Sequence, residues 1–201
     1  MSKQGETRTK ILDTADDLFA DKGFDAVSAR DVAEAAGVAK AAVFYHFGGM
    51  DVLYEAVLAR YYEAHKAALF GVLEQPGTVD ERVHRLVDAY LDFMAENTRY
   101  ARMVQRQVAG GGGNLEPVRA NMAVMLHGIE RALGDVTPKQ GPLAARQFFL
   151  TLSGAVINTF TYAPALEAAW GSDPRSPGAI AERRAHLHWL VDTILAGLRR
   201  A

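Results

Sequence analysis

The stretch VSARDVAEAAGVAKAAVFYHF, residues 27–47, decides the fold because it predicts two short helices and a tight turn. Ser28 followed three residues later by Asp31 has the spacing of a capping box, so a helix is expected to begin there. Gly37 ends that helix, and a second one is expected over residues 39–46. Two such helices form a helix-turn-helix unit, whose second helix can enter the major groove of B-DNA. By spacing alone, the pattern also fits an ordinary three-helix subdomain.

Small residues in this stretch suit close packing of one helix on the other. Ala33 and Ala36 allow the two helices to approach, while Val43 and Phe47 hold the second helix against the first. Four residues are then left on the outward side: Ala39, Lys40, Ala41 and Phe44. Alanine methyl groups can meet thymine methyl groups and a lysine can reach guanine acceptors, so such a helix can read DNA with few charges.

The rest of the chain repeats apolar residues every three to four positions and has no convincing strand-like alternation, which predicts an all-α fold. We expect a three-helix DNA-binding domain over residues 1–48, and a larger helical domain for ligand binding and dimerisation over residues 49–201. About nine helices are expected, near residues 7–22, 28–37, 39–46, 51–75, 78–97, 97–108, 114–133, 142–162 and 179–199. Prolines and glycines in residues 163–178 predict a connection, and the glycines of residues 110–113 predict a mobile loop.

Composition limits the classes of function. The chain has 201 residues, of which 49% are hydrophobic, so it can bury a sizeable core. It has no cysteine, which excludes disulfides, thiol nucleophiles and cysteine metal sites. Its formal net charge of -2 requires that any DNA-binding face be small and local. Because no signal-peptide pattern or membrane-length apolar span is seen, we expect a cytoplasmic protein that does not use a membrane.

Several residues of the opening stretch are together specific to one family. Phe24, Ser28, Val32-Ala33, Ala36-Gly37-Val38 and Phe44-Tyr45-His46-Phe47 closely resemble the TetR family of bacterial transcriptional repressors, over about residues 8–58. The resemblance implies a homodimer that binds double-stranded DNA at a palindromic operator. It also implies that a small-molecule effector, largely apolar, releases the repressor from that operator. No cofactor is implied.

The resemblance also implies roles for single residues. Arg30 and Lys40 would read base edges, Ala41 would touch a thymine methyl group, and Tyr45 and His46 would hold phosphates. The full set expected at the DNA is Arg8, Ser28, Ala29, Arg30, Ala39, Lys40, Ala41, Phe44, Tyr45 and His46.

Three positions depart from the family pattern and weaken the set of phosphate contacts. The family often has a hydroxyl residue, a tyrosine and a lysine where this chain has Ala42, Phe44 and Met50. Phosphate contacts supply much of the affinity for DNA, so other cations are needed in their place. The candidates are the cations near the N-terminus: Lys3, Arg8 and Lys10.

Aromatic residues and methionines recur at inward spacing between residues 50 and 133, which is typical of a core and also of an apolar ligand cavity. Histidine and glutamine among them could fix the orientation of a ligand. The candidates for ligand contact are Tyr61, His65, Tyr90, Met94, Met103, Gln105, Met122, Met125 and His127. A DNA-binding protein without any small-molecule response is built from the same residue types and stays open as an alternative.

Two late helices are rich in apolar residues and need to be covered. The helix over residues 142–162 is apolar around much of its circumference, and the helix over residues 179–199 has a matching stripe. We expect the two to form a four-helix bundle with a partner subunit, through Phe149, Leu152, Ser153, Val156, Phe160, Leu187, Leu190 and Ile194. An intramolecular core is the alternative.

A helical-bundle metalloenzyme is the competing class of function. Glu81 and His84 have the Glu-x-x-His spacing of di-iron bundles, but that site requires a second copy. None is present, and His127 and Glu130 run in the reverse order. The chain also lacks the nucleophile, zinc and phosphate-loop motifs of common enzymes. We therefore expect no catalytic residue and no metal site.

Overall fold

The computed structural model describes residues 3–109 and 116–200 and confirms the all-α prediction. The described residues form ten α-helices and two 3-10 turns. The α-helices are α1 Lys3–Lys22, α2 Ala29–Ala35, α3 Lys40–Phe47, α4 Met50–Leu73, α5 Val79–Glu96, α6 Thr98–Ala109, α7 Glu116–Leu133, α8 Ala145–Thr161, α9 Ala163–Trp170 and α10 Pro177–Leu198; the turns are η1 Phe24–Ala26 and η2 Gly134–Val136. The loop expected over residues 110–113 lies outside the described residues.

Two helices differ from the sequence-based expectation. Helix α1 begins at Lys3, four residues before the expected start, and its first turn carries Glu6, whose charge suits a helix N-terminus. Helix α9 occupies part of the segment expected to be a connection. Its proline lies in the first turn, where no backbone N–H is needed, and Gly171 ends it in a left-handed conformation with φ of 70°. Proline therefore starts this helix.

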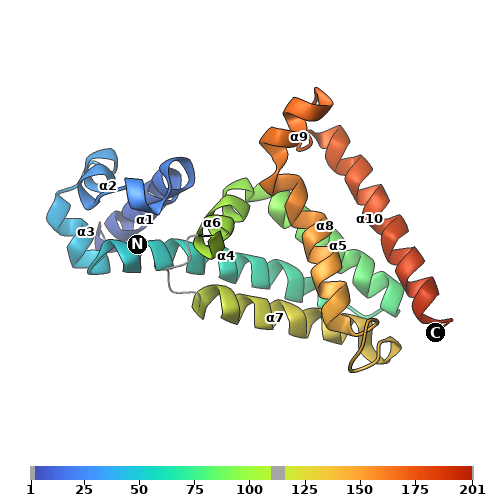
Figure 1. Cartoon of the computed structure of the whole chain (residues 1–201). Helices are drawn as coiled ribbons and strands as arrows, with labels where there is room; N and C mark the ends of the chain where they lie inside the picture. Colours follow the sequence, from blue (N-terminus) through green and yellow to red (C-terminus); the bar gives the residue numbers. More distant parts are fainter. Residues whose placement is uncertain (1–2, 110–115, 201) are drawn as a thin grey trace. The chain divides into compact units, whose positions relative to one another are not determined.

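The chain divides into two compact units, Met1–Glu63 with Arg102–Pro117, and Ala64–Ala101 with Val118–Ala201. In the first unit, α2 packs on both α1 and α3 (Figure 1). Its fully buried side chains include Ile11, Phe19, Val32, Val43 and Leu53. Helix α4 contributes residues to both units. The division expected from the sequence, at residue 48, lies just before this helix.

A buried carboxylate joins α1 to α4 within the first unit. Asp16 is 6% exposed and accepts hydrogen bonds from the Tyr61 hydroxyl at 2.8 Å and from Arg60 Nη2 at 2.8 Å. Arg60 also pairs with the exposed Asp13. A buried charge is stable only when it is paired and hydrogen-bonded, and Asp16 meets both conditions.

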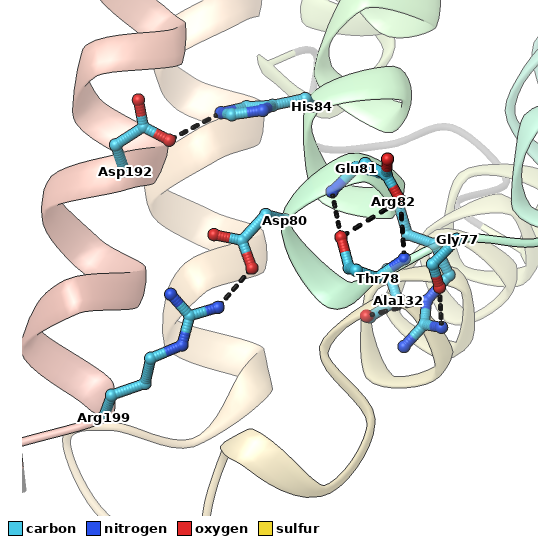
Figure 2. A network of polar contacts seen from close by, with 9 residues as sticks. All are labelled: Gly77, Thr78, Asp80, Glu81, Arg82, His84, Ala132, Asp192 and Arg199. Carbon is cyan, nitrogen blue, oxygen red and sulfur yellow. Dashed lines mark hydrogen bonds and ion pairs between the residues drawn. The ribbon is translucent and has the colours of Figure 1, made fainter.

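In the second unit, α5 packs against both α8 and α10 (Figure 1). A polar row runs along the contact of α5 with α10. We define it as Asp80, His84, Asp88 and Asp92 of α5 with Arg184, His188, Asp192 and Arg199 of α10 and its C-cap. Low numbers on one helix pair with high numbers on the other, so the two helices are antiparallel. Figure 2 shows one end of the row, where Arg199 pairs with Asp80 and His84 Nε2 lies 3.0 Å from Asp192.

The N-terminus of α5 is fixed by local hydrogen bonds (Figure 2). Thr78 and Glu81 form a capping box: the Thr78 hydroxyl accepts from the Glu81 amide, and the Glu81 carboxylate accepts from the Thr78 amide at 2.8 Å. These bonds from Thr78 hold the pKa of Glu81 below its ordinary value. Arg82 donates to the carbonyl oxygen of Gly77 at 2.9 Å and to that of Ala132, at the end of α7, at 3.4 Å. Together these bonds fix where α5 begins.

Replacing Asp16 by Asn is expected to lower the free energy of unfolding by about 1.5–3 kcal/mol, because a charge-assisted hydrogen-bond network loses its charge. Replacing Asp13 by Asn is the matched control, since Asp13 binds the same arginine from an exposed position and its loss should cost no more than about 1 kcal/mol. Urea denaturation measures both. Equal losses in the two variants would contradict the importance of the buried pair.

Candidate nucleic-acid interface and effector site

The turn between α2 and α3 has the geometry that the opening stretch predicts. The Ser28 hydroxyl accepts from the Asp31 amide at 3.2 Å, and the Asp31 carboxylate accepts from the Ser28 amide at 2.8 Å. These bonds from Ser28 lower the pKa of Asp31. Gly37 has φ of +61°, a left-handed conformation that favours glycine, and lets the Val38 amide donate to Ala33 at 2.9 Å. The direction of α3 is therefore set by the backbone.

Helix α3 has one buried side and one exposed side. Val43 and Phe47 are buried in the first unit. Lys40, Ala41, Phe44 and Tyr45 are exposed, the two aromatic residues to 43% and 73%. The Lys40 ammonium lies 5.8 Å from the centre of the Phe44 ring, within the range of a cation–π contact. An exposed helix face with two large aromatic residues and a lysine is available for binding.

The first turn of α1 lies beside α3. Gln4 donates a hydrogen bond to the Tyr45 hydroxyl at 2.9 Å. The guanidinium carbon of Arg8 lies 4.9 Å from the centre of the Phe47 ring, and Arg8 is exposed. Lys10 is also exposed, whereas only the backbone of Lys3 is described. The residues just before the expected start of the first helix are thus part of α1 from residue 3 onward.

Some of the expected DNA contacts are limited by the structure. Ala29 is 6% exposed, and the Ser28 hydroxyl is engaged in the cap of α2. His46 is half-buried, with its ring against those of Tyr45 and Phe47. Arg30 and Ala39 are exposed. The accessible part of the expected set is therefore Arg8, Arg30, Ala39, Lys40, Ala41, Phe44 and Tyr45.

Comparison with known proteins assigns this arrangement to a family. The sequence model described as bacterial regulatory proteins, tetR family, matches residues 11–57, from the core of α1 into α4. What this match assigns to the tetR family is the N-terminal segment of the chain, residues 11–57. The chain is similar to the HTH-type transcriptional activator FasR of Mycolicibacterium smegmatis, with 28% identity over 99 residues, which are 49% of this chain and 45% of that protein. It is also similar to the HTH-type transcriptional repressor KstR2 of Rhodococcus jostii, with 37% identity over 51 residues, 25% of each chain.

These matches cover about half, or less, of the length of the curated relatives. The fold likeness extends further. A bacterial regulatory protein of the tetR family from Rhodococcus RHA1 superposes with a TM-score of 0.70 and 20% identity, over 98% of this chain and 97% of that one. These relatives are named as regulators and not as enzymes, in agreement with the expectation of no enzymatic activity.

In the second unit, aromatic rings from two helices, α5 and α6, surround one histidine of α4. We call this the His65 cluster: His65 of α4, Tyr90 and Phe93 of α5, Tyr100 of α6 and Asn121 of α7. His65 is 4% exposed and stacks on Phe93 with ring centres 4.7 Å apart. Burial lowers its pKa to about 4, so the ring is neutral at pH 7.

The other residues expected at a ligand are scattered. The Tyr61 hydroxyl is bound to Asp16, and Met103 is buried in the first unit. Met94 and Met125 are buried in the second unit, while Met122 is exposed. Gln105 and His127 are exposed as well. Of the candidates, the structure thus brings His65 and Tyr90 together. Asn121 also belongs to the His65 cluster. Because its side chain is polar and half-buried, the apolar period of the helix could not identify it.

The residues expected at a dimer interface fall into two groups. Leu152, Val156, Phe160 and Leu187 are buried in the core of their own protomer. Phe149, Ser153, Leu190 and Ile194 are half-buried. A small apolar void of about 10 Å³ lies among Val83, Leu133, Phe148, Leu152, Val191, Ile194 and Leu195. Its lining is entirely apolar, so it offers no hydrogen-bond partner to an ordered water.

The structure gives no support to the metalloenzyme alternative. The Glu81 carboxylate is used in the cap of α5, and the His84 ring stacks on His188 with centres 4.6 Å apart. Among residues 3–109 and 116–200, no group of three or more histidine, aspartate or glutamate side chains is arranged to hold a metal ion.

The same part of the chain contains no helix with the length and hydropathy required to cross a bilayer.

The low pKa of His65 predicts a loss of stability in mild acid. Its pKa is about 4 in the folded chain and 6.5 ordinarily, so the unfolded chain takes up a proton first as the pH falls below 6.5. His65 should therefore cost about 2 kcal/mol of folding stability between pH 7 and pH 5.

Urea denaturation of the wild type and of His65→Gln at both pH values measures this loss, which the variant should not show. His186→Gln, at an exposed histidine, is the control and should keep the wild-type pH dependence. An identical pH dependence in the wild type and His65→Gln would contradict the assignment.

Proposed function

We propose that this chain is a homodimeric, sequence-specific DNA-binding regulator that acts in the cytoplasm as a repressor and leaves a palindromic operator when a largely apolar effector binds. The observation that carries the proposal is the exposed face of α3, which presents Lys40, Ala41, Phe44 and Tyr45 from a helix fixed by the Gly37 turn. The match of residues 11–57 to the tetR family of regulatory proteins supports it.

In this proposal the interface divides into base readers and backbone contacts. Arg30 and Lys40 read base edges, and Ala41 contacts a thymine methyl group. Phe44 cannot donate a hydrogen bond, so it contributes apolar contact and a cation–π contact to the Lys40 ammonium. Tyr45 and Arg8 contact phosphates, and Gln4 orients the Tyr45 hydroxyl. A few well-placed cations are enough, in line with the net charge of -2.

The dimer is proposed to form through the outward faces of α8 and α10. The large apolar side chains of Leu150 and Trp189 are each 60% exposed, and without a partner subunit they would contact solvent. Gly154 and Gly197 have nothing within 4 Å of the place where a Cβ would lie. A glycine inside a helix lowers the stability of the helix, and no neighbour within the chain requires a glycine at these two positions. Close approach of a partner helix is therefore a reason for both glycines. The half-buried Ser153, Leu190 and Ile194 border these faces.

Selection of bound duplexes from a random DNA library tests the proposal. A two-fold dimer with one recognition helix per half-site should recover a palindrome whose half-sites are about 34–36 Å apart. Sedimentation of the purified protein should show a dimer at micromolar concentration. Failure to recover any sequence, or a strictly monomeric protein, would exclude the proposed function. Loss of binding with one compound of a small-molecule panel would identify the effector, and a panel without effect would favour a regulator that has no small-molecule response.

Arg30→Ala is expected to weaken binding to the selected palindrome by about 1–3 kcal/mol and to relax the preference at one base step, because a side chain that reads a base edge is removed. Competition binding with duplexes altered one base pair at a time measures both effects. A loss that is the same for every sequence would instead place Arg30 on the phosphate backbone.

Arg8→Ala is expected to weaken binding to all duplexes alike and to reduce the slope of log affinity against log salt by about one, as for the loss of one phosphate contact. Titrations at several salt concentrations give the slope. Arg131→Ala, at an exposed arginine in the last turn of α7, is the control. An unchanged slope in Arg8→Ala would show that Arg8 does not substitute for the missing phosphate contacts.

A further inference from the structure

A large apolar ring lies exposed on α3. Phe44 is 43% exposed, and Phe44 and Tyr45 are the two large apolar side chains exposed among the described residues 4–47. A single exposed ring is common on protein surfaces, so its exposure alone does not assign a contact. The neighbours of Phe44 and the chemistry of the DNA groove decide what this ring can bind.

The two exposed aromatic side chains of α3 have different surroundings. The Tyr45 hydroxyl accepts a hydrogen bond from Gln4 of α1 at 2.9 Å, so the Tyr45 ring is held toward α1. Phe44 instead contacts Lys40, one turn earlier, whose ammonium lies 5.8 Å from the centre of its ring. Ala41, three residues before Phe44, is exposed as well and is its neighbour on the helix surface. Phe44 therefore shares one side of α3 with a lysine and an alanine.

The major groove offers one kind of apolar group to such a ring. The edges of the bases there are hydrogen-bond donors and acceptors, together with the C5-methyl group of thymine. Phe44 has no donor or acceptor, so against a polar edge it would remove water without replacing the lost hydrogen bond. Against a methyl group, it removes apolar surface of both partners from water. The base that fits Phe44 is therefore a pyrimidine with a methyl group on C5.

The contact between Phe44 and Lys40 limits where this pyrimidine lies. A lysine reads the O6 and N7 acceptors of guanine. The ammonium of Lys40 is 5.8 Å from the centre of the Phe44 ring, and successive base pairs are about 3.4 Å apart along the duplex. The two side chains thus reach base pairs that are one or two steps apart.

We infer that Phe44 is a specificity-determining residue that reads the C5-methyl group of one thymine in each half-site, within two base pairs of the base pair read by Lys40. The inference rests on the proposed function, because it requires α3 to lie in the major groove. 5-Methylcytosine presents the same methyl group to the ring. Methylation of a cytosine at this position therefore strengthens binding, although the base pair is changed.

Substitution of single methyl groups in the selected palindrome tests the inference on the full chain. Each thymine of one half-site is replaced in turn by uracil, and at each position a cytosine–guanine pair is compared with 5-methylcytosine–guanine. At the position that Phe44 reads, loss of the methyl group from thymine should weaken binding about fourfold, the factor for burying one methyl-sized group. Its addition to cytosine should strengthen binding by the same factor. Fluorescence anisotropy of labelled duplexes measures the affinities.

Three variants separate methyl reading from a general loss of affinity. Phe44→Ala should bind every duplex more weakly and should no longer distinguish thymine from uracil, or 5-methylcytosine from cytosine, at that position. Phe44→Leu keeps an apolar side chain and should retain a difference of at least about twofold, since part of the methyl contact remains. Tyr45→Ala is the matched control at the next exposed ring and should retain the full fourfold difference despite weaker binding. Far-ultraviolet circular dichroism confirms that all three are folded, and titration at low salt keeps weakened binding measurable.

Lys40→Ala locates the second base pair, because it should relax the preference at a base pair within two steps of the thymine that Phe44 reads. A palindrome without any thymine whose sensitivity to methyl loss disappears in Phe44→Ala would overturn the inference. A thymine of that kind more than two base pairs from the Lys40 position would overturn it as well. Either result leaves the proposed function standing, because the palindrome itself is recovered. A chain that selects no DNA sequence would refute the proposed function and this inference together.

Discussion

The placement of the exposed face of α3 depends on one backbone conformation, the positive φ of Gly37. A Cβ at this position would meet only the end of the Lys10 side chain at 3.6 Å, so space is not what requires glycine there. The left-handed conformation itself is the requirement, because it carries the chain from α2 to α3 while the Val38 amide still reaches the Ala33 carbonyl. Every contact of Lys40, Phe44 and Tyr45 with a ligand follows from that direction.

The two capping boxes and the first three helices could be predicted because each rests on a local pattern. Each capping box, Ser28 with Asp31 and Thr78 with Glu81, binds backbone N–H groups that have no partner inside the helix. All of these bonds form within one turn, so sequence spacing alone specifies both capping boxes. The inward faces of α8 and α10 could not be predicted in the same way. Both helices are apolar around much of their surface, so a helical period does not show which side meets the core. Leu152, Val156 and Leu187 proved to face inward, and Leu150 and Trp189 outward.

Buried polar groups in the two units illustrate two different situations. Asp16 has a full set of partners from Tyr61 and Arg60, and such a group fixes the packing of α1 on α4. His65 has a partner on one nitrogen only. Sequence reasoning could mark both residues as unusual in an apolar helix pattern, but the partners come from helices distant in the chain. Whether a buried polar group is satisfied is therefore a property of the tertiary structure.

The polar row between α5 and α10 repeats every four residues on both helices, with Asp80, His84, Asp88 and Asp92 on one side and Arg184, His188 and Asp192 on the other. Four residues rise by roughly 6 Å along a helix, and a shift of that size would bring Asp192 opposite Asp88 or Asp80, so repulsion between like charges disfavours the neighbouring axial positions. Arg184 pairs with two successive carboxylates of the row, those of Asp88 and Asp92. The buried Leu187, Val191 and Leu195 follow the same interval, so the order of charges in the polar row distinguishes axial positions that the apolar face of α10 repeats.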